Sequence, residues 1–155
     1  MAKKKTKTNV MRLLDQHKIP YETYEWEQSM PSNQDIINKP IYKTLVTVGK
    51  SGEHYVFVVP IKDSLHLKKA AKAVDEKNIQ MIKEKDLLPL TGYVHGGCSP
   101  IGMKKELLTT IDQTATHYDH IIVSAGQVGV SVGLDPQKLA EFVQVQFKDI
   151  RTEEV

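Results

Sequence analysis

The sequence has only one cysteine, Cys98, and no long apolar run in its 155 residues. A single thiol cannot form a disulfide within the chain, which fits a reducing cytoplasm. No apolar stretch approaches the roughly 20 residues that a membrane-spanning helix needs. The basic start, Met1 to Lys7, leads into a polar segment and not into the apolar core of a signal peptide. We therefore expect a cytoplasmic protein that has no membrane partner.

A strong excess of charge of either sign is also missing, since the formal net charge is +2. This excludes a protein that coats DNA or RNA with a uniformly basic surface, so a nucleic-acid contact must use a local patch. No DNA partner is expected. Three groups of lysines are candidates for a local patch, although each alone is more typical of a solvated surface: Lys3 to Lys7, Lys68 with Lys69 and Lys72, and Lys104 with Lys105.

The length of the chain fits one domain over residues 1–155, because a chain of this size can bury one sizeable core. Residues 43–48 and 54–59 are rich in β-branched and aromatic side chains and flank a turn from Gly49 to Gly52, which predicts a hairpin. Residues 29–40 have no clear period and are expected to be a loop with one helical turn. Further strands are expected at 21–27, 79–82, 107–111, 121–124, 130–132 and 145–150.

Helices are fewer than strands in the predicted order. Apolar residues at helical spacing predict one helix with a cap at Thr8 or Asn9 and another after Asp63-Ser64, with Leu67, Ala70, Ala71 and Val74 on one face. Residues 83–88 should form a short helix stopped by Pro89 and Gly92, residues 112–118 a turn or short helix, and Asp135-Pro136 should begin a last helix. The expected class is therefore mixed α+β, a curved mixed sheet or partial barrel flanked by helices.

The stretch from Thr91 to Lys105 combines four glycines, a proline, a hydroxyl and a thiol. Gly96 and Gly97 allow positive φ and a close approach of the main chain to a ligand, and Pro100 stiffens the exit. Main-chain N–H groups held in this way suit a bound oxygen. The stretch has the spacing of a phosphate loop but lacks its Gly-Lys-Ser/Thr ending, which excludes a nucleoside triphosphatase of that class.

Three side-chain patterns offer further candidate chemistry. Cys98 and His95 suggest a thiol nucleophile with its base, although a lone cysteine is more typical of a small buried apolar residue. His117 and His120 have the spacing of a metal pair, but without a third ligand they are more typical of surface histidines. Lys43 opens an apolar strand, where an ammonium group can orient a phosphate or carbonyl in a cleft.

Four motifs occur in an order that is similar to a known family. They are Ile41 to Val46, Pro60-Ile61 followed by Leu65 to Ala73, Thr91 to Lys105, and Val123 to Gly129. Together they resemble the YbaK family of aminoacyl-tRNA deacylases, which is related to the editing domain inserted in bacterial prolyl-tRNA synthetases. The match covers nearly the whole chain, and the four motifs in register are specific although no single one is decisive.

The resemblance implies trans-editing, the removal of a wrong amino acid from tRNA, with cysteinyl-tRNA(Pro) as the usual substrate. The implied partners are the 3′ end of the aminoacylated tRNA and prolyl-tRNA synthetase. Catalysis would need no metal, no cofactor and no protein nucleophile, because the substrate's own thiol, or water, attacks the ester. The protein would then accelerate the reaction by positioning the reacting groups and by donating hydrogen bonds to the developing oxyanion.

The resemblance also implies a set of site residues. Lys43 would orient the aminoacylated terminal adenosine, and the glycine loop, Gly96 to Pro100, would shape the pocket beside the ester. Residues expected to take part in catalysis are Lys43, Gly96, Gly97 and Ser99. Residues expected to bind the substrate are Tyr42, Trp26, Tyr93, Cys98, Pro100, Ser124, Gly126 and Gly129.

Three departures from the family pattern leave alternatives open. The segment before the Lys43 strand is short, Gln127 and Val128 stand where many relatives have a basic pair, and Cys98 stands where an aliphatic residue is common. The alternatives are a tRNA-end-binding module without activity, a deacylase for another small aminoacyl-tRNA such as Ala-tRNA(Pro), and a thiol hydrolase that uses Cys98 and His95.

Overall fold

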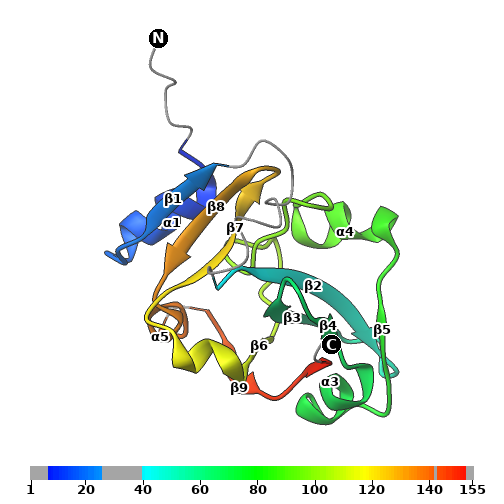
Figure 1. Ribbon diagram of the computed structural model, residues 1–155. Helices are drawn as coiled ribbons and strands as arrows, with labels where there is room; N and C mark the ends of the chain where they lie inside the picture. Colours follow the sequence, from blue (N-terminus) through cyan, green and yellow to red (C-terminus); the bar gives the residue numbers. More distant parts are fainter. Residues whose placement is uncertain (1–6, 26–39, 142, 153–155) are drawn as a thin grey trace.

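The computed structural model describes residues 7–25, 40–141 and 143–152, and it alternates short helices with strands (Figure 1). In chain order the elements are α1 (Asn9–Gln16), β1 (Glu22–Glu25), β2 (Tyr42–Gly49), β3 (His54–Pro60), β4 (Ser64–Leu65), α3 (Leu67–Ala73), β5 (Ile79–Met81), α4 (Glu84–Thr91), β6 (Thr109–Asp112), the 3-10 helix η1 (Gln113–His117), β7 (Ile121–Gln127), β8 (Val130–Leu134), α5 (Pro136–Leu139), β9 (Val145–Lys148) and β10 (Arg151–Thr152).

The strands form three sheets among the described residues. A five-stranded mixed sheet has the order β5-β2-β3-β6-β9, a three-stranded antiparallel sheet has the order β1-β8-β7, and β10 pairs with β4. The two larger sheets meet where Ile41 forms a parallel bridge with Ile122. Mixed sheets flanked by helices were expected, and the sheets do not close into a full barrel in the described part of the chain.

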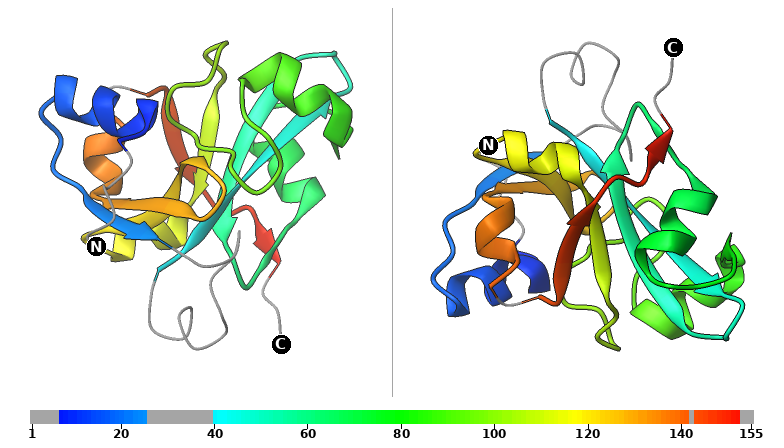
Figure 2. Two further views of the ribbon diagram at one scale, coloured as in Figure 1. Left: turned by 90° about the horizontal axis from the view of Figure 1, so that it is seen from above. Right: turned by 90° about the horizontal axis from the view of Figure 1, so that it is seen from below.

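Strand β3 lies between two hydrophobic cores, and its side chains are buried on both faces. Val56 and Val58 belong to the larger core, which also holds α1 and the strands β7 and β8. Phe57 and Val59 point the other way, into a smaller core with Ala70 of α3. The views of Figure 2 show α3 beside the β2–β3 hairpin and α1 beside the other large sheet. This double burial explains the continuous apolar run in β3.

Several local predictions are confirmed by the structure. The hairpin forms, with Lys43 of β2 opposite Val59 of β3. Thr8 caps α1, since its Oγ1 accepts a hydrogen bond of 3.2 Å from the N–H of Met11. Asp135 caps α5, and Pro136 stands at the first helical position. Each cap satisfies a main-chain donor that the first turn of a helix leaves unpaired.

Helix α4 corrects one prediction, because it runs through Pro89 and ends only at Gly92, whose φ is +86°. Proline removes one main-chain donor of a helix. Pro89 and Lys85, the residue whose carbonyl loses that donor, are both exposed. Water can therefore hydrate the carbonyl, and the left-handed conformation of Gly92 supplies the actual stop.

One strand is longer than predicted, and two further strands were not predicted. β7 continues past Ser124 to Gln127 with a bulge, and Gly126 lies in that bulge at φ +94°. The turn therefore contains Val128 and Gly129 alone. The structure also has two strands that were not predicted, β10 and its partner β4, because a two-residue strand carries too little pattern to be recognised in a sequence. Trp26, Glu27 and the predicted loop at 29–39 lie outside the described residues.

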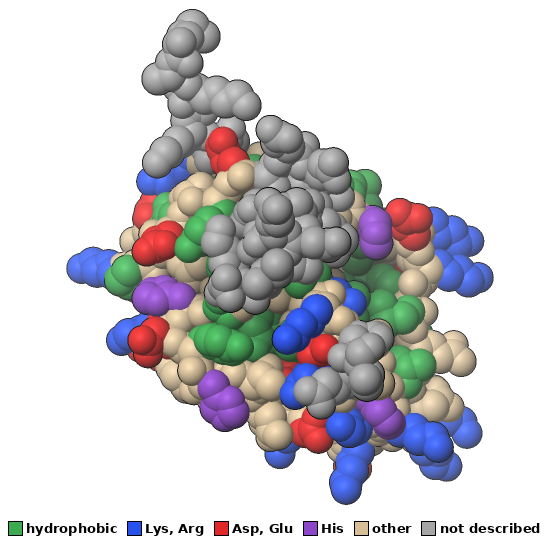
Figure 3. Space-filling view, viewed as in Figure 1, with side chains coloured by type: hydrophobic (Ala, Val, Ile, Leu, Met, Phe, Trp, Pro, Cys, Tyr) green, Lys and Arg blue, Asp and Glu red, His purple; other side chains and the backbone are tan. Residues whose placement is uncertain are grey.

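The described lysines of the three groups have different surroundings. Lys69 binds Asp149, and Lys7 binds Asp15, whereas Lys104 and Lys105 are exposed. Figure 3 shows Lys and Arg side chains at the rim and near the middle of the visible face, with acidic side chains beside some of them. None of the helices in the described ranges is long and apolar enough to cross a membrane.

The Thr8 cap generates a stability prediction. Thr8→Ala should lower the free energy of unfolding by about 1 kcal/mol, because the Met11 N–H loses its acceptor. Urea unfolding followed by circular dichroism measures the change. Gln16→Ala, at the exposed end of the same helix, is the matched control and should shift the value by less than about 0.5 kcal/mol. Equal effects of the two substitutions would contradict the capping role.

Candidate functional site

One pocket of about 410 Å³ lies where β2, α4, the glycine loop and the β7–β8 turn meet. Most of its lining is apolar, with a few polar groups, as is usual for pockets that bind small organic groups. The apolar or main-chain lining comes from Ile41, Tyr42, Leu45, Val46, Ile61, Met81, Ile82, Leu87, Gly96, Cys98, Gly129 and Val130. The polar lining comes from Lys43, Thr44, Glu84, His95, Ser124 and Ser131.

Six of the residues predicted for the site line this pocket together. They come from three separate segments of the sequence: Tyr42 and Lys43 from β2, Gly96 and Cys98 from the glycine loop, and Ser124 and Gly129 from β7 and the turn after it. The fold thus brings the predicted lysine strand and both glycine segments to one place.

Five other predicted residues lie outside the pocket lining. Ser99 is fully buried, and its Oγ accepts a hydrogen bond of 3.2 Å from the N–H of Ile101, which shapes the loop from within. Gly97 and Pro100 are buried beside it, and Tyr93 and Gly126 are half-buried. Trp26 is outside the described residues.

Gly97 sets the distance between the glycine loop and the β7–β8 turn. A Cβ atom at Gly97 would lie 3.0 Å from the main-chain N of Val128, closer than ordinary van der Waals contact allows. The N–H of Gly97 donates to the carbonyl of Val94 at 3.0 Å. Gly97 is therefore needed for close packing of two pocket walls, and its N–H is already used inside the loop.

Tyr93 ties the glycine loop to the bulge of β7. Its hydroxyl donates a hydrogen bond of 2.5 Å to the carbonyl of Ile101. A Cβ atom at Gly126 would lie 3.0 Å from the Tyr93 ring, so the ring packs directly on this glycine. Burial raises the pKa of Tyr93 to about 12, so its hydroxyl stays a neutral donor. Tyr93 supports the pocket from behind its wall.

The pocket lies along an open edge of β2. At one end β2 is bridged to β7 by Ile41 and Ile122, and at the other it pairs with β5 through Thr47 and Met81. Between these points, no strand pairs with Thr44 on that edge in the described part of the chain. An unpaired edge presents main-chain donors and acceptors to whatever lies beside it.

Thr44 places polar groups at this open edge, and sequence reasoning did not single it out. The carbonyl of Val46 accepts from the N–H of Ile82 on the same edge, so the main-chain groups of Thr44, two residues earlier, face the same way. The Oγ1 atom of Thr44 is buried and has no hydrogen-bond partner in the described part of the chain. A buried hydroxyl without a partner is costly, which marks it as a group that suits a bound ligand.

Cys98 is a neutral thiol in the pocket wall. Its side chain is only 8% exposed, and this burial raises its pKa to about 12. Because the thiolate is the nucleophilic form, burial argues against a reactive cysteine at neutral pH. His95 is exposed and also lines the pocket.

The described residues contain no group of three or more His, Cys, Asp or Glu side chains placed to hold a metal ion. His117 and His120 are both exposed. The polar side chains that line the pocket carry one ammonium, one carboxyl, one imidazole and three hydroxyl groups.

Sequence reasoning also missed several pocket residues besides Thr44. Glu84 comes from the first turn of α4, and Ser131 and Val130 come from β8. Only the long-range pairing of strands brings these residues to the pocket. The sequence offered one signal for these residues: each lies within a few residues of a recognised motif.

Comparisons with known proteins agree with this architecture. A family model described as the aminoacyl-tRNA editing domain matches residues 23–142. A protein of Enterococcus faecalis named "Putative Cys-tRNA(Pro)/Cys-tRNA(Cys) deacylase EbsC" is 44% identical over 164 residues, which cover 99% of this chain and 100% of that protein.

Two solved structures share the fold. The hypothetical protein APE2540 has a TM-score of 0.81 at 15% identity, over 92% of this chain and 99% of the other. A crystal structure described as "a putative trans-editing enzyme for prolyl tRNA synthetase" has a TM-score of 0.79 at 22% identity, over 93% and 95%. Family model, relative and fold agree with the resemblance seen in the sequence motifs, and the chain belongs to the aminoacyl-tRNA editing domain family.

Proposed function

We propose that this protein is a trans-editing deacylase that releases cysteine from mischarged Cys-tRNA(Pro). The observation that carries the proposal is the pocket that joins Lys43 of β2 to the glycine loop and to Ser124 of β7. The full-length similarity to a relative named for Cys-tRNA deacylation supports the same substrate. A prolyl-tRNA synthetase that mischarges tRNA(Pro) in the cytoplasm would supply the substrate.

The lining of the pocket suits the end of an aminoacylated tRNA. Its apolar part, which includes Leu45, Ile82 and Leu87, suits a small side chain such as that of cysteine. Lys43 supplies a positive charge on the same strand, suited to a phosphate or carbonyl of the terminal nucleotide. A volume of about 410 Å³ lies in the range of small-molecule sites and is too small for folded RNA, so only the 3′ end would enter.

The proposed chemistry uses the thiol of the substrate. The cysteinyl sulfur attacks the ester carbonyl carbon, and the bond from that carbon to the ribose oxygen breaks. The thiol proton ends on the ribose oxygen, so the tRNA leaves with a free hydroxyl and cysteine leaves as a thiolactone that water opens. Sulfur and carbonyl belong to the same aminoacyl group, so the attack is intramolecular, and the pocket would speed it by holding the two atoms close together.

Donors for the oxyanion are proposed at the β2 edge. The N–H of Gly97 donates to Val94 and so is not available to the substrate. Lys43, together with the hydroxyl and main-chain N–H of Thr44, lies at the edge that borders the pocket. Preorganised donors of this kind stabilise charge that develops in the transition state. The glycine loop then serves as the wall that closes on the ester.

The test of the function is a panel of purified charged tRNAs. Cysteinyl-tRNA(Pro) should lose its cysteine fastest, ahead of alanyl-tRNA(Pro) and of correctly charged prolyl-tRNA(Pro), as measured by release of labelled amino acid. Faster release of alanine than of cysteine would show that the reaction is deacylation but that the substrate is alanyl-tRNA(Pro). Salt-sensitive binding of tRNA without release from any of them would indicate a binding module instead and would overturn the proposal.

The proposed role of Lys43 is tested by the substitution Lys43→Ala. The substitution should lower kcat/KM for Cys-tRNA(Pro) by roughly ten- to a hundredfold, the effect of losing one charged contact to the substrate. Circular dichroism should show an unchanged fold. Lys50→Ala, in the exposed turn after β2, is the matched control for loss of a lysine and should keep the activity. Equal activity of the two variants would rule out the proposed role of Lys43.

Cys98→Ser tests whether the protein supplies the nucleophile. Activity should stay within about threefold of the unchanged protein, because the buried thiol carries no negative charge at neutral pH. Iodoacetamide should alkylate the folded protein at least about ten times more slowly than the urea-unfolded chain in the same mildly alkaline buffer. Abolished activity with fast alkylation would point to a thiol hydrolase instead.

Gly97→Ala tests the close contact between the glycine loop and the β7–β8 turn. The added Cβ must displace the main chain at Val128, so kcat/KM should fall by roughly tenfold. Gly52→Ala is the control: Gly52 has φ +92° but nothing within 4 Å of an added Cβ. It should lower the stability by about 1 kcal/mol and leave deacylation unchanged. Full activity of the Gly97 variant would show that the two walls need not touch.

A further inference from the structure

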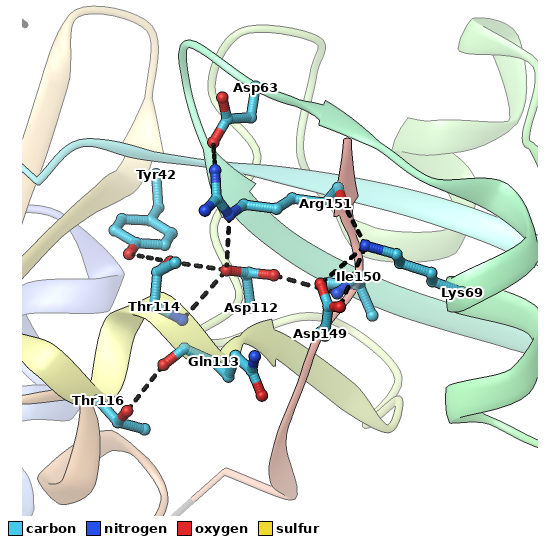
Figure 4. A network of polar contacts seen from close by, with 10 residues as sticks. All are labelled: Tyr42, Asp63, Lys69, Asp112, Gln113, Thr114, Thr116, Asp149, Ile150 and Arg151. Atoms are coloured by element: carbon cyan, nitrogen blue, oxygen red, sulfur yellow. Dashed lines mark hydrogen bonds and ion pairs between the residues drawn. The ribbon is translucent and has the colours of Figure 1, made fainter. Parts of the chain in front are cut away.

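A buried polar network lies behind the pocket wall and connects it to the C-terminal strand (Figure 4). It links Tyr42 at the start of β2, Thr114 of η1, Asp112 at the end of β6 and Arg151 of β10. Tyr42 is the member that lines the pocket, and it directly precedes Lys43. The network therefore ends one residue from the proposed catalytic lysine.

The hydrogen bonds of Thr114 have a defined direction. Its hydroxyl lies 2.7 Å from Asp112 Oδ2, which only accepts when ionised, so the Thr114 proton points to the aspartate. The Tyr42 hydroxyl lies 2.7 Å from the same Thr114 oxygen and must then be the donor in that pair. Burial raises the pKa of Tyr42 to about 12, which keeps this proton in place at neutral pH.

Asp112 is held from several sides and fully buried. Its Oδ2 also accepts from the N–H of Thr114 at 3.1 Å, and its Oδ1 accepts from the N–H of Ile150 at 3.0 Å. Arg151 Nε lies 3.6 Å from Oδ2. The carboxylate thus fixes the start of η1 and the approach to β10 at once.

Arg151 bridges two buried carboxylates. Its Nη1 lies 2.9 Å from Oδ2 of Asp63, which is 1% exposed, while its Nε faces Asp112. The rigid fork of a guanidinium can serve two acceptors in fixed directions, which an ammonium cannot do. The side chain of Arg151 is itself 25% exposed, so its charge stays in contact with water.

Asp63 gives the network a second connection to the pocket. Its N–H donates to the carbonyl of Pro60 at 3.0 Å, which fixes the turn after β3. In that turn, Ile61 lines the pocket and donates its N–H to the carbonyl of Ile41 at 2.9 Å. Arg151 therefore braces both strand ends that flank Lys43, the start of β2 and the end of β3.

We propose that Arg151 is a positioning residue for deacylation, acting through Asp112 and Thr114 on Tyr42 and thus on the strand that carries Lys43. The inference rests on the proposed function of the pocket. Stability alone is a weak reason for such a network, because buried ion pairs seldom contribute more than well-packed apolar side chains of the same volume. The polar network fixes the direction of the Tyr42 ring better than apolar packing would.

The first test compares two threonines of the same 3-10 helix. Thr114→Val cuts the chain between Tyr42 and Asp112, whereas the control Thr116→Val removes only a hydroxyl bonded to the carbonyl of Gln113. Thr114→Val should lower kcat for Cys-tRNA(Pro) by about three- to tenfold with little change in KM, the signature of lost positioning. Thr116→Val should change neither constant.

A double-mutant cycle separates positioning from direct contact with the substrate. Tyr42→Phe keeps the ring on the pocket and removes only the hydroxyl. If the hydroxyl acts through Thr114, the double variant should be no slower than the slower single variant, because both break the same chain. If Tyr42→Phe is slow while Thr114→Val keeps full kcat, the hydroxyl contacts the substrate and the proposed chain through Thr114 is wrong.

Arg151 is tested by two substitutions. Arg151→Met removes the guanidinium from two buried carboxylates and should lower kcat further than Thr114→Val, with a loss of thermal stability. Arg151→Lys restores the charge without the fork and should recover the melting temperature more than kcat. If kcat simply follows the melting temperature through the whole series, the role is structural and the proposal is overturned.

Hydrogen exchange tests the network independently of catalysis. The amides of β2 next to Tyr42 should exchange faster in Thr114→Val than in Thr116→Val under native conditions, and unchanged exchange would overturn the inference. If the unchanged protein releases no amino acid from any tRNA, the proposed function is wrong. Hydrogen exchange would still test whether the network holds the start of β2 in place.

Discussion

The bridge between Ile41 and Ile122 is the contact on which the site depends, because it joins the two larger sheets at the start of β2. From that point β2 leaves β7, and it meets β5 only at Thr47. Between these contacts, Thr44 has β3 on one side and no strand on the other among the described residues, and the pocket lies along that second side. Two sheets that share a strand end but not its whole length thus produce a binding edge inside a folded protein, where an edge at the surface would invite pairing with other chains.

The parts of the fold with a strong local pattern were predictable from sequence. The β2–β3 hairpin, the Thr8 and Asp135 caps and the helix over Leu67–Ala73 follow from periodicity and capping chemistry that act within a few residues. The parts that failed depend on distant partners. Pro89 was misjudged because only its exposure makes a proline tolerable in a helix, and β4 and β10 exist because they pair with each other across the fold.

The site divides in the same way. Lys43 and the glycine loop carry recognisable motifs, and the fold brings them to one pocket. Thr44 lies inside a recognised motif but was given no role there, and Glu84 and Ser131 lie in no motif; all three matter because they line that pocket. Gly97 and Ser99 were recognised as part of the loop, but the structure gives them the task of shaping it, through contact with Val128 and a hydrogen bond from Ile101. A motif predicts where a site lies better than it predicts which atom does what.

Arg151 and Asp63 are 88 residues apart in the chain, yet their ion pair holds the turn that borders the pocket. A ribosome makes the hairpin of β2 and β3 long before it makes β10. The lysine strand can therefore fold early, while its wall stays unbraced until the last described strand is in place. An order of this kind gives the nascent chain a folded hairpin before its pocket wall is braced, so the lysine strand takes its final position only after the ribosome has made β10.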